Sequence, residues 1–270
     1  MLRKLTKYEF KASGRLLLPL YAGILIMAVL SGIFTRISSE AFADSAANMP
    51  KFISFFTTIS MVLYILSIMA GVFLSFIVSI IRFKRNLFDA EGYLMNTLPV
   101  TTSQNITAKM FAASAYQILG MLVCAVSVFI FMLISVDKFF INFTDFFELL
   151  WKFMLKTESG NLILFAIEAV VIAIVSFFCI NLMFYAAISV GHSANSHRVA
   201  KSIGVYILLY VIGQIILFYI VPAVISIIPI PYTMLSMHII LIGTAVAEAV
   251  YAAAYFLITH YFIKNKLNLQ

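Results

Sequence analysis

The chain has 270 residues, of which 63% are hydrophobic and only 11% are charged. Its 18 basic and 11 acidic side chains are too few to cover a chain of this size with a polar surface. The composition therefore excludes a soluble globular protein and predicts an all-α integral membrane protein with one domain over residues 1–270. The net charge of +7 does not indicate a nucleic-acid partner, because no soluble domain remains to carry a basic face.

A basic arm, residues 1–15, begins the chain. Its apolar residues fall near one side of a helix, which predicts an amphipathic helix at the inner headgroup layer of the bilayer. Two interpretations are open. In the first, the arm only sets the topology of the chain. In the second, it is a mechanical elbow helix, which includes Tyr8, Glu9 and Phe10 and links cytoplasmic events to the first span.

Six stretches of the chain are long and apolar enough to cross a bilayer, whose core of about 30 Å requires about 20 helical residues. Ala41-Phe42-Ala43, beyond the first of them, resembles a signal-peptide cleavage site, but the preceding apolar run is too long for a signal peptide. We therefore expect the first span to be retained. The predicted spans are Leu16 to Phe34, Phe52 to Ile81, Met110 to Ser135, Asn161 to Val190, Ile203 to Ile228 and Met234 to Ile263.

Lys and Arg residues set the orientation of these spans. The N-terminal arm, the second and fourth connections and the C-terminal tail together hold 13 of the 18 basic residues. The positive-inside rule then predicts that both termini are cytoplasmic.

The second connection, residues 82–109, is too polar to span a membrane and too apolar for a free loop. We predict a short cytoplasmic helix up to Met95, which is stopped by Leu98-Pro99 because proline disfavours the helical conformation of the residue before it. Such a helix would present Tyr93 and its apolar neighbours to a partner. Thr101 and the two residues after it are candidate N-caps for the next helix.

The longest outer connection, residues 136–160, carries aromatic side chains at helical spacing among its charges. Aromatic rings favour the headgroup zone, so this segment is predicted to lie on the outer leaflet as an interfacial helix.

Two carboxylates, Glu168 and Glu248, fall inside predicted spans. An ionised carboxylate at the centre of the bilayer costs several kcal/mol unless it is paired or hydrated, so Glu248 should face protein or a cavity on a substrate path. The alternative is a protonated or hydrogen-bonded packing residue on the alanine-rich face of its helix. Gln214 and Asn181 are candidate partners, each better explained by an interhelical hydrogen bond than by substrate binding.

No catalytic or metal-binding motif accompanies these residues. The sequence lacks a P-loop and the H-E-x-x-H, C-x-x-C and G-x-S-x-G patterns. His192 and His197 do not share a helix face, and Cys124 and Cys179 lie in apolar runs, so neither a metal site nor a disulfide is predicted. We expect a protein that is not an enzyme and binds no cofactor itself.

Two short segments carry a resemblance to a known family. They are Lys7-Tyr8-Glu9-Phe10-Lys11-Ala12-Ser13-Gly14-Arg15 with Leu18-Pro19-Leu20-Tyr21, and Glu91-Gly92-Tyr93-Leu94 through Thr97-Leu98-Pro99-Val100. Both segments resemble the permease subunits of bacterial type 2 ABC exporters. The six-span layout with both ends inside agrees with that family over nearly the whole chain.

This resemblance implies a homodimer, or a heterodimer with a similar permease, in a bacterial plasma membrane. It also implies separately encoded ABC ATP-binding subunits, which would hold the ATP and Mg. A broken, re-entrant segment before the last span is implied as well, with Val221-Pro222 and Ile228-Pro229-Ile230-Pro231 as its counterpart. The residues that would couple this chain to the ATPase are Asp89, Glu91, Gly92, Tyr93, Leu98 and Pro99.

Two other classes of function remain open. A proton-coupled secondary transporter would use Glu248 and Glu168, although many such carriers are built from internal repeats and none is visible here. A membrane scaffold or sensor that transports nothing would tolerate the loss of Glu248. The substrate is not selected by the sequence, since antimicrobial peptides, lipids and other amphiphiles all fit the family.

Overall fold

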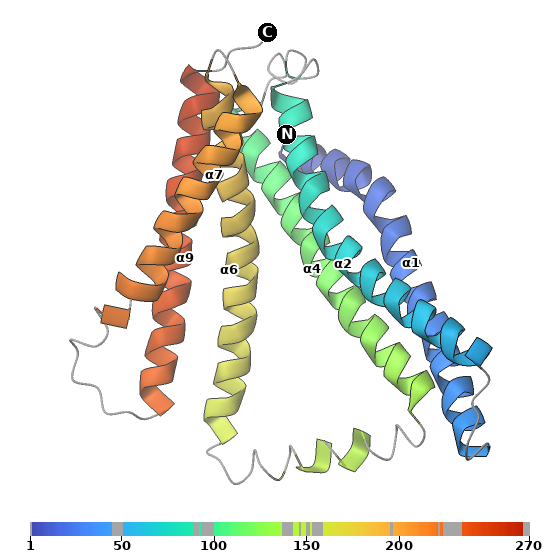
Figure 1. Ribbon diagram of the computed structural model, residues 1–270. Coiled ribbons are helices and arrows are strands. Elements are labelled where there is room, and N and C mark those ends of the chain that lie inside the picture. The colour runs from blue at the N-terminus through green and yellow to red at the C-terminus, as the bar shows by residue number, and fades with distance from the viewer. Residues whose placement is uncertain are drawn as a thin grey trace. The chain divides into compact units, whose positions relative to one another are not determined.

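The computed structural model describes residues 2–44, 51–88, 92, 100–136, 143–145, 147–149, 152, 159–194, 197–220, 222–223 and 234–266. These ranges contain helices and no strand. Six helices are long and apolar enough to cross a membrane, which confirms the predicted all-α, multi-span architecture. The helices are α1 (Leu2–Asp44), α2 (Lys51–Leu87), α4 (Thr102–Ser135), α6 (Ser159–His192), α7 (Arg198–Ile215), the π-helical turn η1 (Ile216–Ile220) and α9 (Met234–Asn265) (Figure 1).

Several helices continue past the predicted spans. Helix α1 runs without interruption from Leu2 to Asp44 and includes Pro19, so the residues predicted as an elbow are the first turns of the same helix as the first span. The segment predicted to be re-entrant falls mostly outside the described residues, which include only Pro222 and Ala223 of it.

The chain divides into two compact units. Unit 1 comprises residues 1–11, 77–115 and 158–270, and unit 2 comprises residues 12–76 and 116–157. Helices α1, α2 and α4 contribute to both units, whereas α6, α7 and α9 belong to unit 1.

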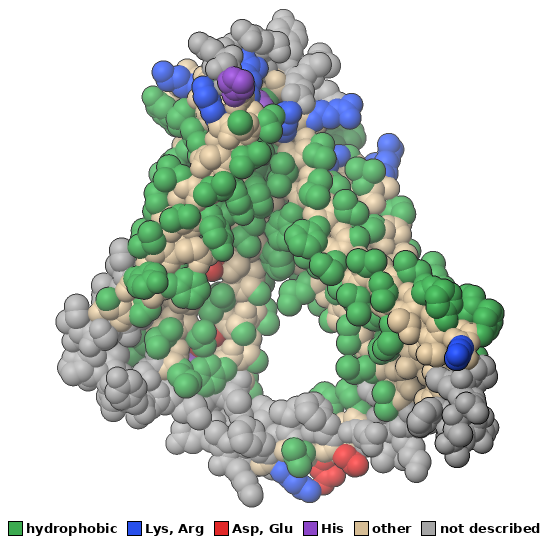
Figure 2. All heavy atoms as spheres, viewed as in Figure 1, with side chains coloured by type: hydrophobic (Ala, Val, Ile, Leu, Met, Phe, Trp, Pro, Cys, Tyr) green, Lys and Arg blue, Asp and Glu red, His purple; other side chains and the backbone are tan. Residues whose placement is uncertain are grey.

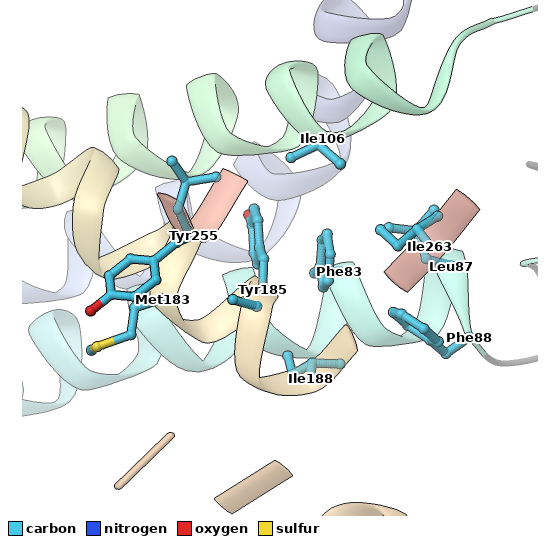
Figure 3. Packing of buried hydrophobic residues seen from close by; sticks show 11 residues of the cluster. Phe83, Leu87, Phe88, Ile106, Met183, Tyr185, Ile188, Tyr255 and Ile263 are labelled. Atoms are coloured by element: carbon cyan, nitrogen blue, oxygen red, sulfur yellow. The ribbon is translucent and has the colours of Figure 1, made fainter. Parts of the chain in front are cut away.

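In unit 1, helix α6 packs against α7 and α9 (Figure 1). An apolar core joins these helices to the last turns of α2 and the first turns of α4 (Figure 3). At its centre the rings of Phe83 and Tyr185 stack face to face, with centroids 3.8 Å apart. Lys and Arg side chains of this unit gather at the end where α6 ends and α7 begins (Figure 2). The core therefore lies next to the basic, predicted cytoplasmic end of the helices.

Gly191 lets α6 and α7 meet closely. A Cβ added at Gly191 would lie 2.5 Å from the backbone nitrogen of Ser202 and 2.6 Å from its Cα. Gly191→Ala is therefore expected to lower the free energy of unfolding by about 1–3 kcal/mol, because helix backbone would have to move. The measurement is SDS-induced unfolding in mixed micelles. Gly204→Ala is the matched control, since nothing lies within 4 Å of its new Cβ, and equal stability of the two variants would contradict the prediction.

Unit 2 packs the remaining parts of α1, α2 and α4 through small residues and tyrosines. The Tyr21 hydroxyl donates to the carbonyl of Tyr116 at 2.7 Å, and the Tyr64 and Ser127 hydroxyls lie 3.1 Å apart. Gly120 faces the Tyr21 hydroxyl, where a Cβ would approach to 2.7 Å. Small residues allow close helix approach in lipid, where packing and buried hydrogen bonds supply the attraction between helices.

Thr101 caps α4, as predicted. Its Oγ1 accepts a hydrogen bond from the backbone N–H of Gln104 at 3.3 Å, and its own N–H donates to Gln104 Oε1 at 3.4 Å. This reciprocal pair is a capping box, which satisfies N–H groups that the first turn of a helix leaves unpaired.

The predicted outer connection, residues 136–160, is described only at residues 136, 143–145, 147–149, 152 and 159–160. The rings of Phe143 and Phe147 lie 4.6 Å apart, and Lys152 pairs with Glu148 at 2.8 Å. The hydrogen bond from Lys152 lowers the pKa of the Glu148 carboxyl below its usual value. Phe143 and Phe147 are therefore both in helical conformation, while most of the predicted interfacial helix lies outside the described residues.

Candidate functional site

A buried carboxylate, Glu9, brings three helices of unit 1 together. Its side chain accepts hydrogen bonds from Arg82 Nη2 at 2.6 Å and from Lys109 Nζ at 2.5 Å. Asn86 Nδ2 adds a longer contact at 3.4 Å. Glu9 and Lys109 are both 4% exposed, so these charges are almost entirely removed from solvent. We call these four residues the Glu9 cluster.

The positions of these residues follow from helix geometry. Arg82 and Asn86 are four residues apart near the end of α2, so they share one face of that helix. Lys109 lies two turns into α4, while Glu9 is in the early turns of α1. Residues 89–99, which contain the predicted coupling segment, separate the end of α2 from the start of α4. The Glu9 cluster thus holds the arm against both helices that border that segment.

The electrostatics of the Glu9 cluster depend on its one acid. One carboxylate faces two cations, and a buried ion pair is stable only when its charges and hydrogen bonds are well matched. Removal of Glu9 would leave Arg82 and Lys109 as two like charges beside each other. Glu9 is therefore the member on which the arrangement depends most.

A second set of buried polar side chains in unit 1 includes Ser79, which lies three residues before Arg82 on α2. The Tyr185 hydroxyl lies 3.0 Å from Ser79 Oγ. Ser79 Oγ donates to Asn181 Oδ1 at 2.9 Å, and Asn181 Nδ2 donates to Ser114 Oγ at 3.1 Å.

These contacts join α2, α4 and α6 through side-chain hydrogen bonds. Asn181, one of the predicted intramembrane polar residues, is 1% exposed and makes interhelical hydrogen bonds. It does not line the cavity that contains Glu248.

Glu248, on α9, lines a cavity of about 200 Å³ between α6, α7 and α9. Ser176 Oγ, on α6, donates to Glu248 Oε2 at 2.6 Å. Gln214, a predicted partner, lines the same cavity from α7. Tyr210, Tyr251 and Tyr255 supply aromatic walls.

Glu168, the second intramembrane acid, pairs with His238. Its Oε2 lies 2.8 Å from His238 Nδ1, and the Phe165 ring stacks on the imidazole with centroids 3.9 Å apart. The second oxygen, Glu168 Oε1, and His238 Nε2 are both buried, and neither has a hydrogen-bond partner among the described residues. The pair joins α6 to α9 away from the Glu248 cavity.

The predicted coupling residues are mostly outside the described part of the chain. Asp89, Glu91, Tyr93, Leu98 and Pro99 fall there, and Gly92 is described as a buried helical residue. In the predicted elbow, Tyr8 is 70% exposed, Phe10 is half-buried and Glu9 is buried.

No metal site emerges from the described ranges. Within them, no three His, Cys, Asp or Glu residues lie close enough to hold a metal ion. Cys124 and Cys179 are free thiols.

Sequence reasoning missed the partners rather than the acids. Arg82 and Lys109 counted only toward topology, and His238 went unnoticed although it lies four residues into the predicted last span. An ionisable side chain inside a span was the available signal for His238. Ser176 offered no signal, because intramembrane serines are common and usually bond to their own helix.

Comparison of the chain with family models, with curated proteins and with solved structures gave no match.

Proposed function

We propose that this chain is the transmembrane permease subunit of a bacterial ATP-driven exporter of the type 2 ABC class. The observation that carries the proposal is the Glu9 cluster. It is supported by the resemblance to that family of two segments, the one that contains Glu9 and the one that lies between α2 and α4 in the sequence. The Glu9 cluster ties the arm to the last turns of α2 and the first turns of α4. These helices border residues 89–99, which resemble the element that contacts the ATPase.

The proposed mechanism passes movement from residues 89–99 into the membrane. A push on this segment displaces the end of α2 and the start of α4 together, because Arg82 and Lys109 share the Glu9 carboxylate. The arm follows, since Glu9 belongs to α1. Asn181 passes the displacement to α6 through its hydrogen bonds with Ser79 and Ser114.

The same proposal defines the partners and the location. ATP and Mg bind to a separate ABC ATP-binding subunit, and a second permease copy, identical or similar, completes the path. The complex lies in the bacterial plasma membrane with both termini of this chain in the cytoplasm, as the basic arm and connections favour. The six candidate spans support the membrane location.

The test begins with gentle detergent extraction from the native membrane and identification of the proteins that co-purify. A stoichiometric ATP-binding subunit with vanadate-sensitive ATP hydrolysis is the expected result. A chain that purifies alone, under conditions that preserve a known ABC complex, would overturn the proposal.

Glu91→Lys tests the coupling segment within that experiment. We expect the variant to insert in the membrane but to retain at least about tenfold less ATPase subunit, because reversed charge at a contact places like charges together. Glu148→Lys is the matched control, since it makes the same charge reversal on the exposed outer connection. If the two variants retain equal amounts of the ATPase subunit, Glu91 is not part of the contact.

One observation favours a second candidate, a proton-coupled secondary transporter. The buried contact between Glu168 and His238 joins a carboxyl group to an imidazole, and intramembrane acids and histidines are common in proton relays. Reconstituted protein separates the candidates. Transport by the exporter stops when ATP is removed, whereas transport by the carrier stops when the proton gradient is dissipated.

A further inference from the structure

The Glu248 cavity combines a carboxylate with aromatic walls at mid-depth in the helices that form it. Ser176 and Glu248 each lie near the middle of their candidate spans, Ile163–His192 and Met237–Asn265. The cavity volume of about 200 Å³ exceeds the roughly 150 Å³ of an engineered cavity that binds benzene. It can therefore hold the head of an organic molecule with a few carbon atoms.

The carboxylate has a hydroxyl partner but no cationic one. Ser176 Oγ donates to Glu248 Oε2, and no described Lys, Arg or His forms an ion pair with this acid. An ionised carboxylate at mid-membrane costs several kcal/mol unless a cation neutralises it. The cavity is thus electrostatically matched to a positively charged ligand and opposed to an anionic one.

The rest of the lining favours an organic cation over a metal ion. Tyr210, Tyr251 and Tyr255 line the cavity with apolar residues between them. Aromatic faces attract alkylammonium groups through their quadrupole, and such cages recognise quaternary ammonium ligands. The Tyr251 hydroxyl is also buried without a hydrogen-bond partner in the structure. A metal would need several hard or nitrogen ligands, and the described residues supply no group of three.

We propose that the Glu248 cavity binds a hydrophobic organic cation through the Glu248 carboxylate and the three tyrosine rings. As a substrate class for the exporter, this inference rests on the function proposed above. Binding itself needs neither ATP nor a partner, so it is tested on the purified chain. If the chain binds the cation but has no ATPase partner, the cation site is supported and the exporter function is contradicted. If the chain has an ATPase partner but binds no cation, the exporter function is supported and the cation site is contradicted.

The experiment is isothermal titration calorimetry of the full chain in neutral detergent with benzyltrimethylammonium as the probe. Neopentylbenzene, in which carbon replaces the charged nitrogen, is the neutral control for partition into the micelle. We expect saturable binding of the cation, and no displacement by the neutral analogue. Absence of saturable cation binding, or full displacement by the neutral analogue, would overturn the proposal.

Glu248→Gln is expected to weaken cation binding at least about tenfold, because it removes the negative charge that attracts the cation. Glu148→Gln makes the same change at an exposed acid outside the cavity, and should bind the probe as the unchanged chain does. Tyr251→Leu is a second variant that keeps the carboxylate and removes one ring, with an expected loss of several fold. Unchanged affinity in both Glu248→Gln and Tyr251→Leu would place the probe elsewhere.

Discussion

Replacement of Glu9 by leucine is expected to lower the free energy of unfolding by about 3–5 kcal/mol. The variant leaves Arg82 and Lys109 close together without their shared carboxylate, and the Lys109 side chain is 3% exposed. The two cations then repel each other, and removal of one partner from a buried ion pair is far more costly than loss of the pair as a whole. The measurement is SDS-induced unfolding in mixed micelles.

A double variant separates this cause from a loss of packing. Lys109→Met removes the most buried cation, so Glu9→Leu combined with Lys109→Met should be more stable than Glu9→Leu alone. Arg82, whose side chain is 21% exposed, retains access to water in that double variant. A double variant no more stable than Glu9→Leu would show that charge imbalance is not the cause.

Glu40→Leu is the matched control for Glu9→Leu. Glu40 lies on the same helix and also pairs with an arginine, Arg36, at 2.9 Å, but both side chains are at least half exposed. Exposed pairs of this kind contribute about 0–1 kcal/mol. We therefore expect the control to unfold almost as the unchanged chain does.

Replacement of His238 by leucine is the second change with a large expected effect, about 2–4 kcal/mol of lost stability. Glu168, with a side chain 10% exposed, would lose its hydrogen-bond partner. Its other oxygen already has none, so the whole carboxyl would be buried and unsatisfied. The same SDS titration measures the loss.

Removal of both groups should restore much of this stability. Glu168→Leu with His238→Leu leaves no buried polar atom behind and keeps an apolar contact between α6 and α9. His260→Leu is the control on α9, because the His260 ring stacks near Phe256 without pairing with an acid in the structure. A single His238→Leu variant as stable as His260→Leu would count against a structural role for the pair.

The spans could be predicted because bilayer thickness makes each one a run of about 20 apolar residues. Helix ends could not be placed as well. Residues 82–87 include three basic side chains and an asparagine, so hydropathy ends the second span at Ile81, whereas α2 continues to Leu87. Backbone hydrogen bonding carries a helix past the membrane boundary when no proline or glycine stops it.

The acids of the candidate site could be found from the sequence, and their partners could not. Glu9 has many cations available at the predicted cytoplasmic end, and only the packing of α1 against α2 and α4 selects Arg82 and Lys109. Glu168 and His238 are 70 residues apart, a separation that carries no pairing signal in a single sequence. Gln214 could be assigned to the same region as Glu248 because both lie in the last two spans.

The Glu9 cluster also bears on how the protein is made. Glu9 is synthesised 73 residues before Arg82 and 100 residues before Lys109. At a synthesis rate of about 5–20 residues per second, roughly 5–20 seconds pass between the synthesis of Glu9 and that of Lys109. During that interval the start of α1 must stay in contact with water or lipid headgroups, because its carboxylate has no partner with which to be buried. The arm therefore reaches its buried position only after Lys109, near the start of α4, has been made.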